Sequence, residues 1–167
     1  MKIITYNVNG IRAALKKGWL DWFKAESPDV ICIQEIKASP DQVPEIALLE
    51  EMGYEHYWYP AQKKGYSGTA IFTRITPNHI EYGWGHEDYD FEGRVIRADF
   101  DKASVMSVYF PSGTTGDIRQ DFKYKFLDDF QLYSNDLLKD KPNLVVCGDF
   151  NICHKAIDIH NPKSNAN

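Results

Sequence analysis

Stretches of apolar residues separated by polar turns dominate the chain, and four of these stretches end in polar side chains. They cover residues 3–7, 30–35, 105–109 and 144–151. Runs of this length that are rich in Val and Ile predict buried strands. If the strands lie side by side, their ends place five polar residues around one mouth: Asn7, Glu35, Tyr109, Asp149 and Asn151. Carboxylate and amide oxygens are the ligands that hard cations such as Mg²⁺ prefer, so the pattern predicts a metal-dependent enzyme.

Helical periodicity appears between these strands. Apolar residues recur at helical spacing over 19–23 until Ser27-Pro28 stops the helix. A second helix is expected over 39–52, with Gly53 as its terminator. A long amphipathic helix is expected from 116 to 139. This alternation of strands and helices predicts an α/β protein with helices packed on a sheet.

The middle of the chain contains short strand-like segments separated by Gly, Pro, Asn or Asp. They cover residues 54–59, 68–74, 79–82, 94–100 and 104–109. Short strands with few residues between them indicate antiparallel pairing, so we expect a mixed sheet. We find no internal repeat, low-complexity tract or linker, and we therefore expect a single domain over residues 1–167.

Composition narrows the class of protein. A chain of 167 residues with 43% hydrophobic residues is long enough for one substantial core. It has no apolar run of membrane-spanning length, and its N-terminus enters a strand directly, so we expect a cytoplasmic protein that does not bind membranes. Cys32 and Cys147 lie inside apolar strands, and the spacing with Cys153 fits neither a zinc site nor a disulfide scaffold. Reduced thiols are expected.

The charge of the chain limits how it could bind nucleic acid. The net charge of −5 argues against indiscriminate binding, because that affinity comes from cations that neutralise phosphates. Three local clusters could still bind: Lys16 with Lys17, Lys63 with Lys64, and Arg94 with Arg97. Each of the two Lys pairs is also explained as a solvated face.

The candidate site residues differ in how specific they are. Asp149 and Asn151 follow Gly148, which permits a tight turn, and their spacing lets both side chains point the same way from an extended segment. The same stretch is also typical of an Asx turn that caps a strand. Glu35 after an apolar run is costly unless it is paired, solvated or metal-bound, although it could mark the surface end of a strand. Tyr109 is also typical of a half-buried strand aromatic.

Two further segments have ordinary explanations as well. Asn7 precedes Asn9-Gly10, which is common turn chemistry. The glycines in residues 64–68 could bring backbone amides close to a phosphate, but a hairpin turn accounts for them equally well. Taken together, these structural explanations are less convincing than a shared site, because unrelated surface residues have no reason to gather at the same end of several strands.

Six motifs in chain order carry a resemblance to a known family. They are Tyr6-Asn7-Val8-Asn9-Gly10-Ile11-Arg12, residues 29–37, Gly65-Tyr66-Ser67-Gly68, residues 92–96, Tyr109-Phe110-Pro111, and Gly148-Asp149-Phe150-Asn151 followed by Ile157-Asp158. On these motifs the whole chain resembles the exonuclease III family of apurinic/apyrimidinic endonucleases, within the wider endonuclease/exonuclease/phosphatase superfamily.

The resemblance implies a four-layer α/β sandwich with mixed, largely antiparallel sheets. It implies a monomeric phosphodiesterase that depends on Mg²⁺, with Mn²⁺ as a possible substitute. The implied activity is cleavage of double-stranded DNA 5′ to an abasic site, with 3′ to 5′ exonuclease and 3′-phosphatase activity on blocked ends.

The resemblance also assigns roles to individual residues. It implies metal contacts for Asn7, Glu35, Asp149 and Asn151, with Lys37 near the Glu35 cluster. Asp149 would orient or deprotonate the attacking water, Asn151 would contact the scissile phosphate or the metal, and Tyr109 would approach the phosphate or the leaving oxygen. The residues expected to bind DNA are Arg12, Lys37, Tyr66, Ser67, Arg94 and Asn165.

The chain departs from the family pattern in two places. Asn9 stands where some relatives carry Asp, which lowers the negative charge near the metal. The family's later Asp, its aromatic lesion-pocket loop and its terminal Ser-Asp-His motif would all lie beyond Asn167. We therefore expect a domain truncated at its C-terminus, with about two-thirds of its length present. By itself such a chain is expected to be inactive.

Two other functions stay open at this point. The first is a superfamily phosphodiesterase that acts on undamaged DNA, an inositol phosphate or a sphingolipid. The second is a non-catalytic DNA-binding module, which the missing His favours if 167 residues is the natural length. Gly65-Tyr66-Ser67-Gly68 and Tyr109-Phe110-Pro111 favour DNA repair.

Overall fold

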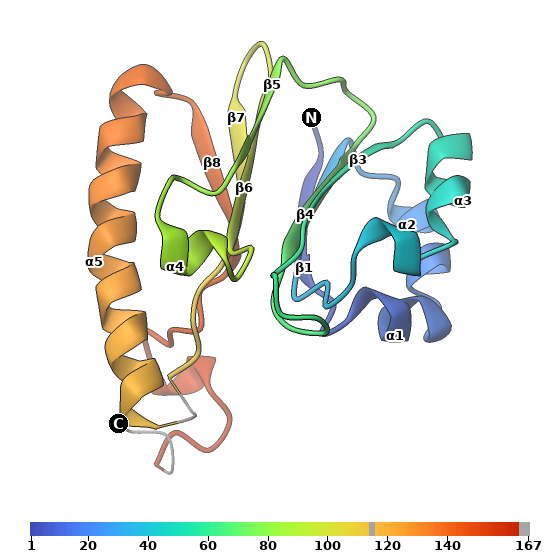
Figure 1. Cartoon of the computed structure of the whole chain (residues 1–167). Coiled ribbons are helices and arrows are strands. Elements are labelled where there is room, and N and C mark those ends of the chain that lie inside the picture. Colours follow the sequence, from blue (N-terminus) through green and yellow to red (C-terminus); the bar gives the residue numbers. More distant parts are fainter. Residues whose placement is uncertain (114–115, 164–167) are drawn as a thin grey trace.

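Two four-stranded sheets pack face to face in the computed structural model, which describes residues 1–113 and 116–163. Helices α1, α2 and α3 cover the outer face of one sheet, and α4 and α5 cover the outer face of the other (Figure 1). The order of layers is therefore helix, sheet, sheet, helix. This arrangement confirms the predicted four-layer α/β sandwich.

Both sheets repeat the same pairing order. The first sheet has the strand order β1-β2-β4-β3, from β1 (Ile3–Asn7), β2 (Val30–Gln34), β3 (Glu55–Tyr59) and β4 (Thr69–Thr73). The second has the order β5-β6-β7-β8, from β5 (His79–Tyr82), β6 (Val95–Asp99), β7 (Ser104–Tyr109) and β8 (Leu144–Asp149). In each, one edge strand pairs in parallel with its neighbour, and the remaining pairs are antiparallel.

The sheets are stacked so that equivalent strands face each other. β1 lies over β8, β2 over β7 and β4 over β6. The side chain of Gln34 at the end of β2 donates to the Ser107 hydroxyl of β7 at 2.9 Å, which links the two layers directly. The C-terminal ends of all four parallel strands consequently meet at one end of the sandwich. The predicted strands are confirmed, except that the successive strands β4 and β5 belong to different sheets.

The helices show one correction to the sequence prediction. α1 (Ile11–Lys16) and α2 (Trp19–Glu26) follow β1, and α5 (Asp117–Asp140) is the predicted long helix. The single helix expected over 39–52 is instead a short 3₁₀ turn, η1 (Pro40–Gln42), followed by α3 (Ile46–Glu51). Pro44 lies between them, and proline cannot donate the backbone hydrogen bond that a continuous helix needs. Within the described residues, three short elements were not predicted: α1, α4 (Glu87–Asp90) and η2 (Ala156–Asp158).

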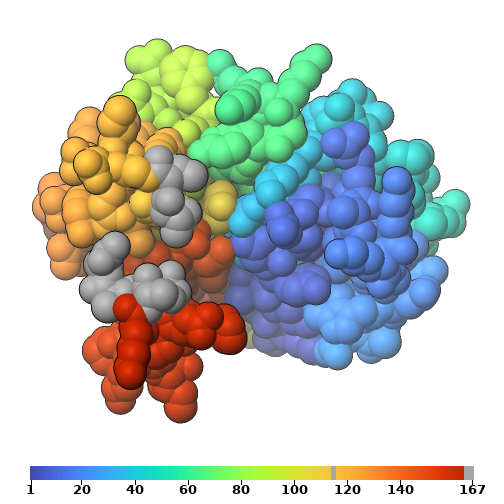
Figure 2. Space-filling view, turned by 90° about the horizontal axis from the view of Figure 1, so that it is seen from below, coloured from blue at the N-terminus to red at the C-terminus, as the bar shows by residue number. Residues whose placement is uncertain are grey.

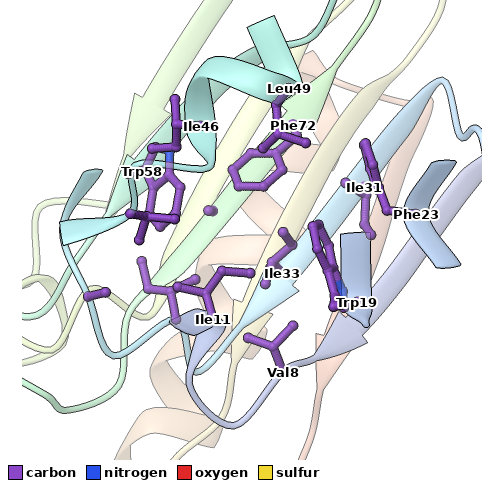
Figure 3. Close-up of a cluster of buried hydrophobic side chains, with 14 of the residues drawn as sticks. Val8, Ile11, Trp19, Phe23, Ile31, Ile33, Ile46, Leu49, Trp58 and Phe72 are labelled. Carbon is purple, nitrogen blue, oxygen red and sulfur yellow. The ribbon is translucent and has the colours of Figure 1, made fainter. Parts of the chain in front are cut away.

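Burial explains why the strand pattern was so clear. Every residue of β2 is buried, because one face of this strand packs on the helices and the other on the second sheet. Trp19, Phe23 and Phe72 fill the layer between the first sheet and its helices (Figure 3). Smaller side chains, among them Cys32 and Ala98, fill the space between the sheets.

Two predictions from composition can be compared with the structure. The three cysteines are free: Cys32 is buried, Cys147 is half-buried and Cys153 is exposed. Within residues 1–113 and 116–163, the helices lack the length or the apolar character needed to cross a membrane.

Candidate active site

Four strand ends bring the predicted site residues together. Asn7 is the last residue of β1 and Glu35 directly follows β2, while Tyr109 and Asp149 are the last residues of β7 and β8. Tyr109 and Asp149 are register partners in the parallel β7–β8 pair. Because the carboxyl ends of parallel strands meet at one edge, the side chains converge from both sheets. Figure 2 views this end of the molecule, where N-terminal, central and C-terminal parts of the chain adjoin.

Asn7 joins the two halves of the site. Its Nδ2 atom donates to Glu35 Oε1 at 2.8 Å and to Asp149 Oδ2 at 2.8 Å. Its Oδ1 atom accepts from the Asn9 backbone N–H at 2.9 Å. A carboxamide has two N–H donors, and here each one serves a carboxylate from a different sheet. The amide therefore links the two carboxylates across the space between the sheets.

Glu35 is surrounded by groups that favour its ionised form. Lys37 Nζ lies 2.8 Å from Glu35 Oε2 and 2.6 Å from the Asn9 side-chain oxygen. Burial by itself would raise the pKa of Glu35, but hydrogen bonds from Asn7, Lys37 and Tyr109 outweigh burial and hold that pKa below its ordinary value. Burial and the charge of Glu35 together raise the pKa of Tyr109 well above its ordinary value. The phenol therefore keeps its proton at neutral pH and can donate a hydrogen bond.

The β8 end has a tightly held turn. The Asn151 backbone N–H donates to Asp149 Oδ1 at 3.0 Å, which is the Asx turn that the sequence left open as an alternative. The Asn151 side-chain amide donates to the Phe110 carbonyl at 2.8 Å. The turn thus fixes one carboxylate oxygen of Asp149, while Asn7 fixes the other. The metal and phosphate contacts of Asn151 stay a prediction.

Backbone strain gathers around this end of the sandwich. Among the described residues, seven that are not glycine have a positive φ, and five of these belong to the site or adjoin it: Asn9 (47°), Glu35 (53°), Lys37 (50°), Ser67 (44°) and Asn151 (48°). Residues other than glycine rarely adopt this backbone conformation, and it persists only where surrounding contacts enforce it. Such concentration is typical of functional sites.

The donor chemistry fits a hard divalent cation. The described residues hold no group of three or more His, Cys, Asp and Glu side chains that could bind a metal by themselves. Glu35 and Asp149 with the neighbouring amides nevertheless form an all-oxygen set at one place. Mg²⁺-type ions commonly use one or two carboxylates, and water and substrate phosphates complete their coordination. The chemistry does not fit zinc, which prefers nitrogen and sulfur ligands.

The residues predicted to bind DNA fall into two groups. Arg12 is exposed on α1, and Lys37 and Tyr66 are half-exposed near the site. Ser67 and Arg94 are each only 1% exposed, and their contact with DNA stays a prediction. Asn165 lies outside the described residues.

Three relevant residues were missed by the sequence analysis. Asn9 was noted only as a departure from the family pattern, yet it accepts a hydrogen bond from Lys37. Glu92 binds the buried guanidinium of Arg94 at 2.6 Å. Arg119 binds Glu92 and Tyr66 from α5. Its helical spacing showed a polar position but gave no indication of a partner so distant in sequence.

Comparison with known proteins gives a consistent result. The sequence model of the Endonuclease/Exonuclease/phosphatase family matches residues 4–167. An exodeoxyribonuclease of Bacillus subtilis (strain 168) is 42% identical over 168 residues, covering 100% of this chain and 65% of the relative. The chain thus spans less than two-thirds of that relative's length.

Solved structures agree. An AP endonuclease from Archaeoglobus fulgidus has a TM-score of 0.83 and 31% identity, over 100% of this chain and 63% of that one. A 3′ phosphatase from Neisseria, bound to a product DNA hairpin, has a TM-score of 0.85 and 28% identity, over 98% of this chain and 63% of that one.

Proposed function

Because this chain belongs to the endonuclease/exonuclease/phosphatase family, we propose that the protein is a Mg²⁺-dependent DNA-repair phosphodiesterase. The proposed reaction is incision of double-stranded DNA 5′ to abasic sites, with 3′ to 5′ exonuclease and 3′-phosphatase activity. The names of its relatives support this choice of substrate. The observation that carries the proposal is the single Asn7 amide that holds carboxylates from both sheets, 2.8 Å away on each side.

In the proposed reaction Asp149 receives the proton of the attacking water. Attack forms a new P–O bond, and one ester P–O bond breaks. The Asx turn and Asn7 hold the two oxygens of Asp149, so the carboxylate is oriented before substrate arrives. A divalent cation held by Glu35, together with Asp149 and Asn7, would polarise the phosphate and offset the charge that develops on its oxygens.

Tyr109 and Lys37 act on charge that develops at the phosphate. The pKa of Tyr109 is raised, so its hydroxyl keeps the proton and can donate a hydrogen bond to a phosphate oxygen or to the leaving oxygen, which takes its own proton from solvent water. Lys37 supplies positive charge beside Glu35, where the overall negative charge of the protein would otherwise repel DNA. Donors fixed in place before the reaction stabilise a transition state without the cost of reorganisation.

The proposed DNA contacts lie beside these groups. Arg12 on α1 is exposed, and Lys63 lies with its ammonium 5.3 Å from the centre of the Tyr66 ring. Cations of this kind bind phosphates without reading sequence, while an aromatic ring can stack on an unpaired base. The combination suits a duplex that carries a gap in its base stacking.

Cleavage of a duplex oligonucleotide with one abasic-site analogue tests the proposal. The protein, expressed from its natural start to its natural stop codon, is assayed with Mg²⁺, with Mn²⁺ and with EDTA, beside residues 1–167 alone. We expect metal-dependent incision 5′ to the lesion and none on the undamaged duplex. Equal cutting of undamaged DNA would contradict specificity for abasic sites and favour a phosphodiesterase that acts on undamaged DNA. Binding without any cleavage would favour a DNA-binding module.

Two variants and a matched control locate the chemistry. Asp149→Ala should lower the rate by about two to three orders of magnitude or more and leave DNA binding intact. Glu35→Ala should raise the Mg²⁺ concentration needed for half-maximal rate. Asp136→Ala removes a carboxylate that is 79% exposed on α5 and should change neither. Wild-type kinetics for both site variants would contradict the assignment.

A further inference from the structure

Helix α5 presents two cationic side chains toward the candidate site. Arg119 and Lys123 lie four residues apart, so they share one face of the helix. The Arg119 side chain is 25% exposed, and Lys123 is half-buried. Neither residue is among the predicted site residues, and each contacts a different loop of the site.

Arg119 holds the loop that contains Tyr66. Its Nη2 atom donates to the Tyr66 hydroxyl at 3.1 Å and to Glu92 Oε2 at 3.1 Å, and its Nη1 atom donates to Glu92 Oε1 at 3.0 Å. The guanidinium also lies over the Phe122 ring, 4.3 Å from its centre. A planar guanidinium fixed on several sides imposes an orientation that a flexible ammonium cannot.

Glu92 extends this contact to the end of β7. Its Oε2 atom also accepts from Nε of the buried Arg94 at 2.6 Å. Arg94 Nη1 in turn donates to the Tyr109 carbonyl at 2.7 Å. Burial would raise the pKa of Glu92, but Arg119 and Arg94 lower it below its ordinary value, so the carboxylate stays charged and keeps both arginines bound.

Lys123 holds the opposite loop. Its Nζ atom donates to the backbone carbonyl of Asn151 at 2.6 Å. Asn151 has a φ of 48°, a conformation that needs support from neighbouring groups, and its own N–H fixes Asp149. One turn of α5 therefore contacts both sides of the mouth.

We propose that Arg119 and Lys123 are positioning residues, through which α5 holds the Tyr66 loop and the Asp149–Asn151 turn at a fixed separation. Arg119 sets the DNA-contacting side and Lys123 sets the side that carries the proton acceptor. The kinetic part of this inference rests on the proposed function. The structural part does not.

Residue-resolved amide hydrogen exchange tests the structural part on the whole protein. The Gly68 N–H is bonded to the Glu92 carbonyl, and the Asn151 N–H is bonded to Asp149, so each reports on one loop. Local opening appears as faster exchange at such amides without change elsewhere. Arg119→Met should accelerate exchange at Gly68 about tenfold and leave Asn151 unchanged, since a charged hydrogen bond is worth about that factor or more. Lys123→Met should do the reverse.

Lys125→Met is the matched control, because Lys125 is on the same helix but its side chain is 58% exposed and its ion pair with Asp88 spans 4.0 Å. It should change neither amide. If Arg119→Met does not fold, Arg119→Lys, which keeps the charge and loses the planar fork, should show a smaller effect at Gly68. Unchanged exchange at both reporter amides, or equal acceleration at the core amide of Ile71, would overturn the inference.

Steady-state cleavage of abasic DNA supplies the kinetic part. Arg119→Met should raise KM about tenfold with little change in kcat, while Lys123→Met should lower kcat about tenfold. A purely structural role would not change KM in one variant and kcat in the other. If each variant changed KM and kcat equally, the kinetic part of the inference would be overturned. If the wild-type protein does not cleave, the proposed function fails, and the exchange pattern still decides whether α5 positions the loops.

Discussion

The replacement Asn7→Asp challenges the central feature of the site. It preserves the size of the side chain and the oxygen that accepts from the Asn9 backbone, but it replaces the Nδ2 donor with a charged oxygen. Two attractive contacts of 2.8 Å, to Glu35 and to Asp149, become contacts between like charges. Three carboxylates then share one half-buried place.

The cost can be worked from these distances. Two like charges 4 Å apart repel by about 4 kcal/mol at an effective dielectric constant of 20, and the half-exposed surroundings reduce this. Losing a hydrogen bond to a charged group costs about 1.5–3 kcal/mol, and two are lost here, so this part amounts to about 3–6 kcal/mol. Proton uptake by the cluster offsets part of the sum. We expect the free energy of unfolding to fall by about 3 kcal/mol at pH 8.

The sign of the pH dependence follows from the direction of the pKa change. In the variant, repulsion raises the folded-state pKa of the cluster above the unfolded values, so the folded protein binds more protons than the unfolded chain. The penalty is full above the raised pKa and disappears as the pH falls toward the ordinary carboxyl range. The variant should therefore be closer to wild type at pH 5 than at pH 8.

Urea unfolding at pH 5 and pH 8 in the presence of EDTA, so that no divalent cation offsets the added charge, followed by tryptophan fluorescence, measures this. Two of the four tryptophans, Trp19 and Trp58, are buried in the core and report its loss. Asn7→Ala is the comparison, since it removes the donor and adds no charge, and its deficit should depend less on pH. If Asn7→Asp matched wild type at pH 8, or if both variants lost equal stability at both pH values, the bridging role of the amide would be refuted.

Three further predictions use other parts of the molecule. Burial would raise the pKa of Asp99, but hydrogen bonds from Arg97 and other neighbours lower it from 3.8 to about 2. About 2 kcal/mol of stability is therefore present above about pH 4 and is lost as the pH falls toward 2. In acid unfolding experiments Asp99→Asn should lose this dependence of stability on pH, and a variant that keeps it would contradict the prediction. Gly148→Ala places a Cβ 2.0 Å from the Val108 carbonyl oxygen, which should cost about 1–3 kcal/mol, and an unchanged melting temperature would show that the strands yield freely. Comparing ultraviolet titrations of wild type and Tyr109→Phe should show no phenolate from Tyr109 below about pH 10, whereas ionisation at the ordinary tyrosine pKa would disprove the effect of burial and the adjacent carboxylate.

The strands and their ends could be predicted because both are local properties of the chain. A strand that is buried on both faces, such as β2, leaves an unbroken apolar run, and a polar residue after such a run marks its end. Asn7, Glu35, Tyr109 and Asp149 were found in this way. Pro44 is also visible in the sequence, but the helical spacing of apolar residues continues on both sides of it and hides the break that its missing N–H causes.

The burial of two loop residues and the contacts of α5 could not be predicted, because they depend on partners that are distant in sequence. Ser67 and Arg94 lie next to glycines, which favours an exposed loop, yet both are buried. A buried guanidinium is tolerated only where carboxylates and carbonyls surround it, and these come from Glu92 and the end of β7. The contact of Arg119 with Tyr66 crosses 53 positions of the chain. Helical spacing identifies a polar face and leaves its partner undetermined.

The matching pairing order of the two sheets makes the backbone on one side of the site resemble the backbone on the other. Asn7 and Asp149 each end an edge strand, and Gln34 and Tyr109 each end the inner strand beside it. The backbone therefore offers similar surroundings on either side of the site. A phosphodiester also has two ester oxygens of similar shape, but only one of them leaves in a given cleavage. In the proposed function the side chains would therefore set the polarity of the bound strand, because an amide stands opposite a carboxylate and a phenol opposite another amide, while the backbone is nearly the same on both sides.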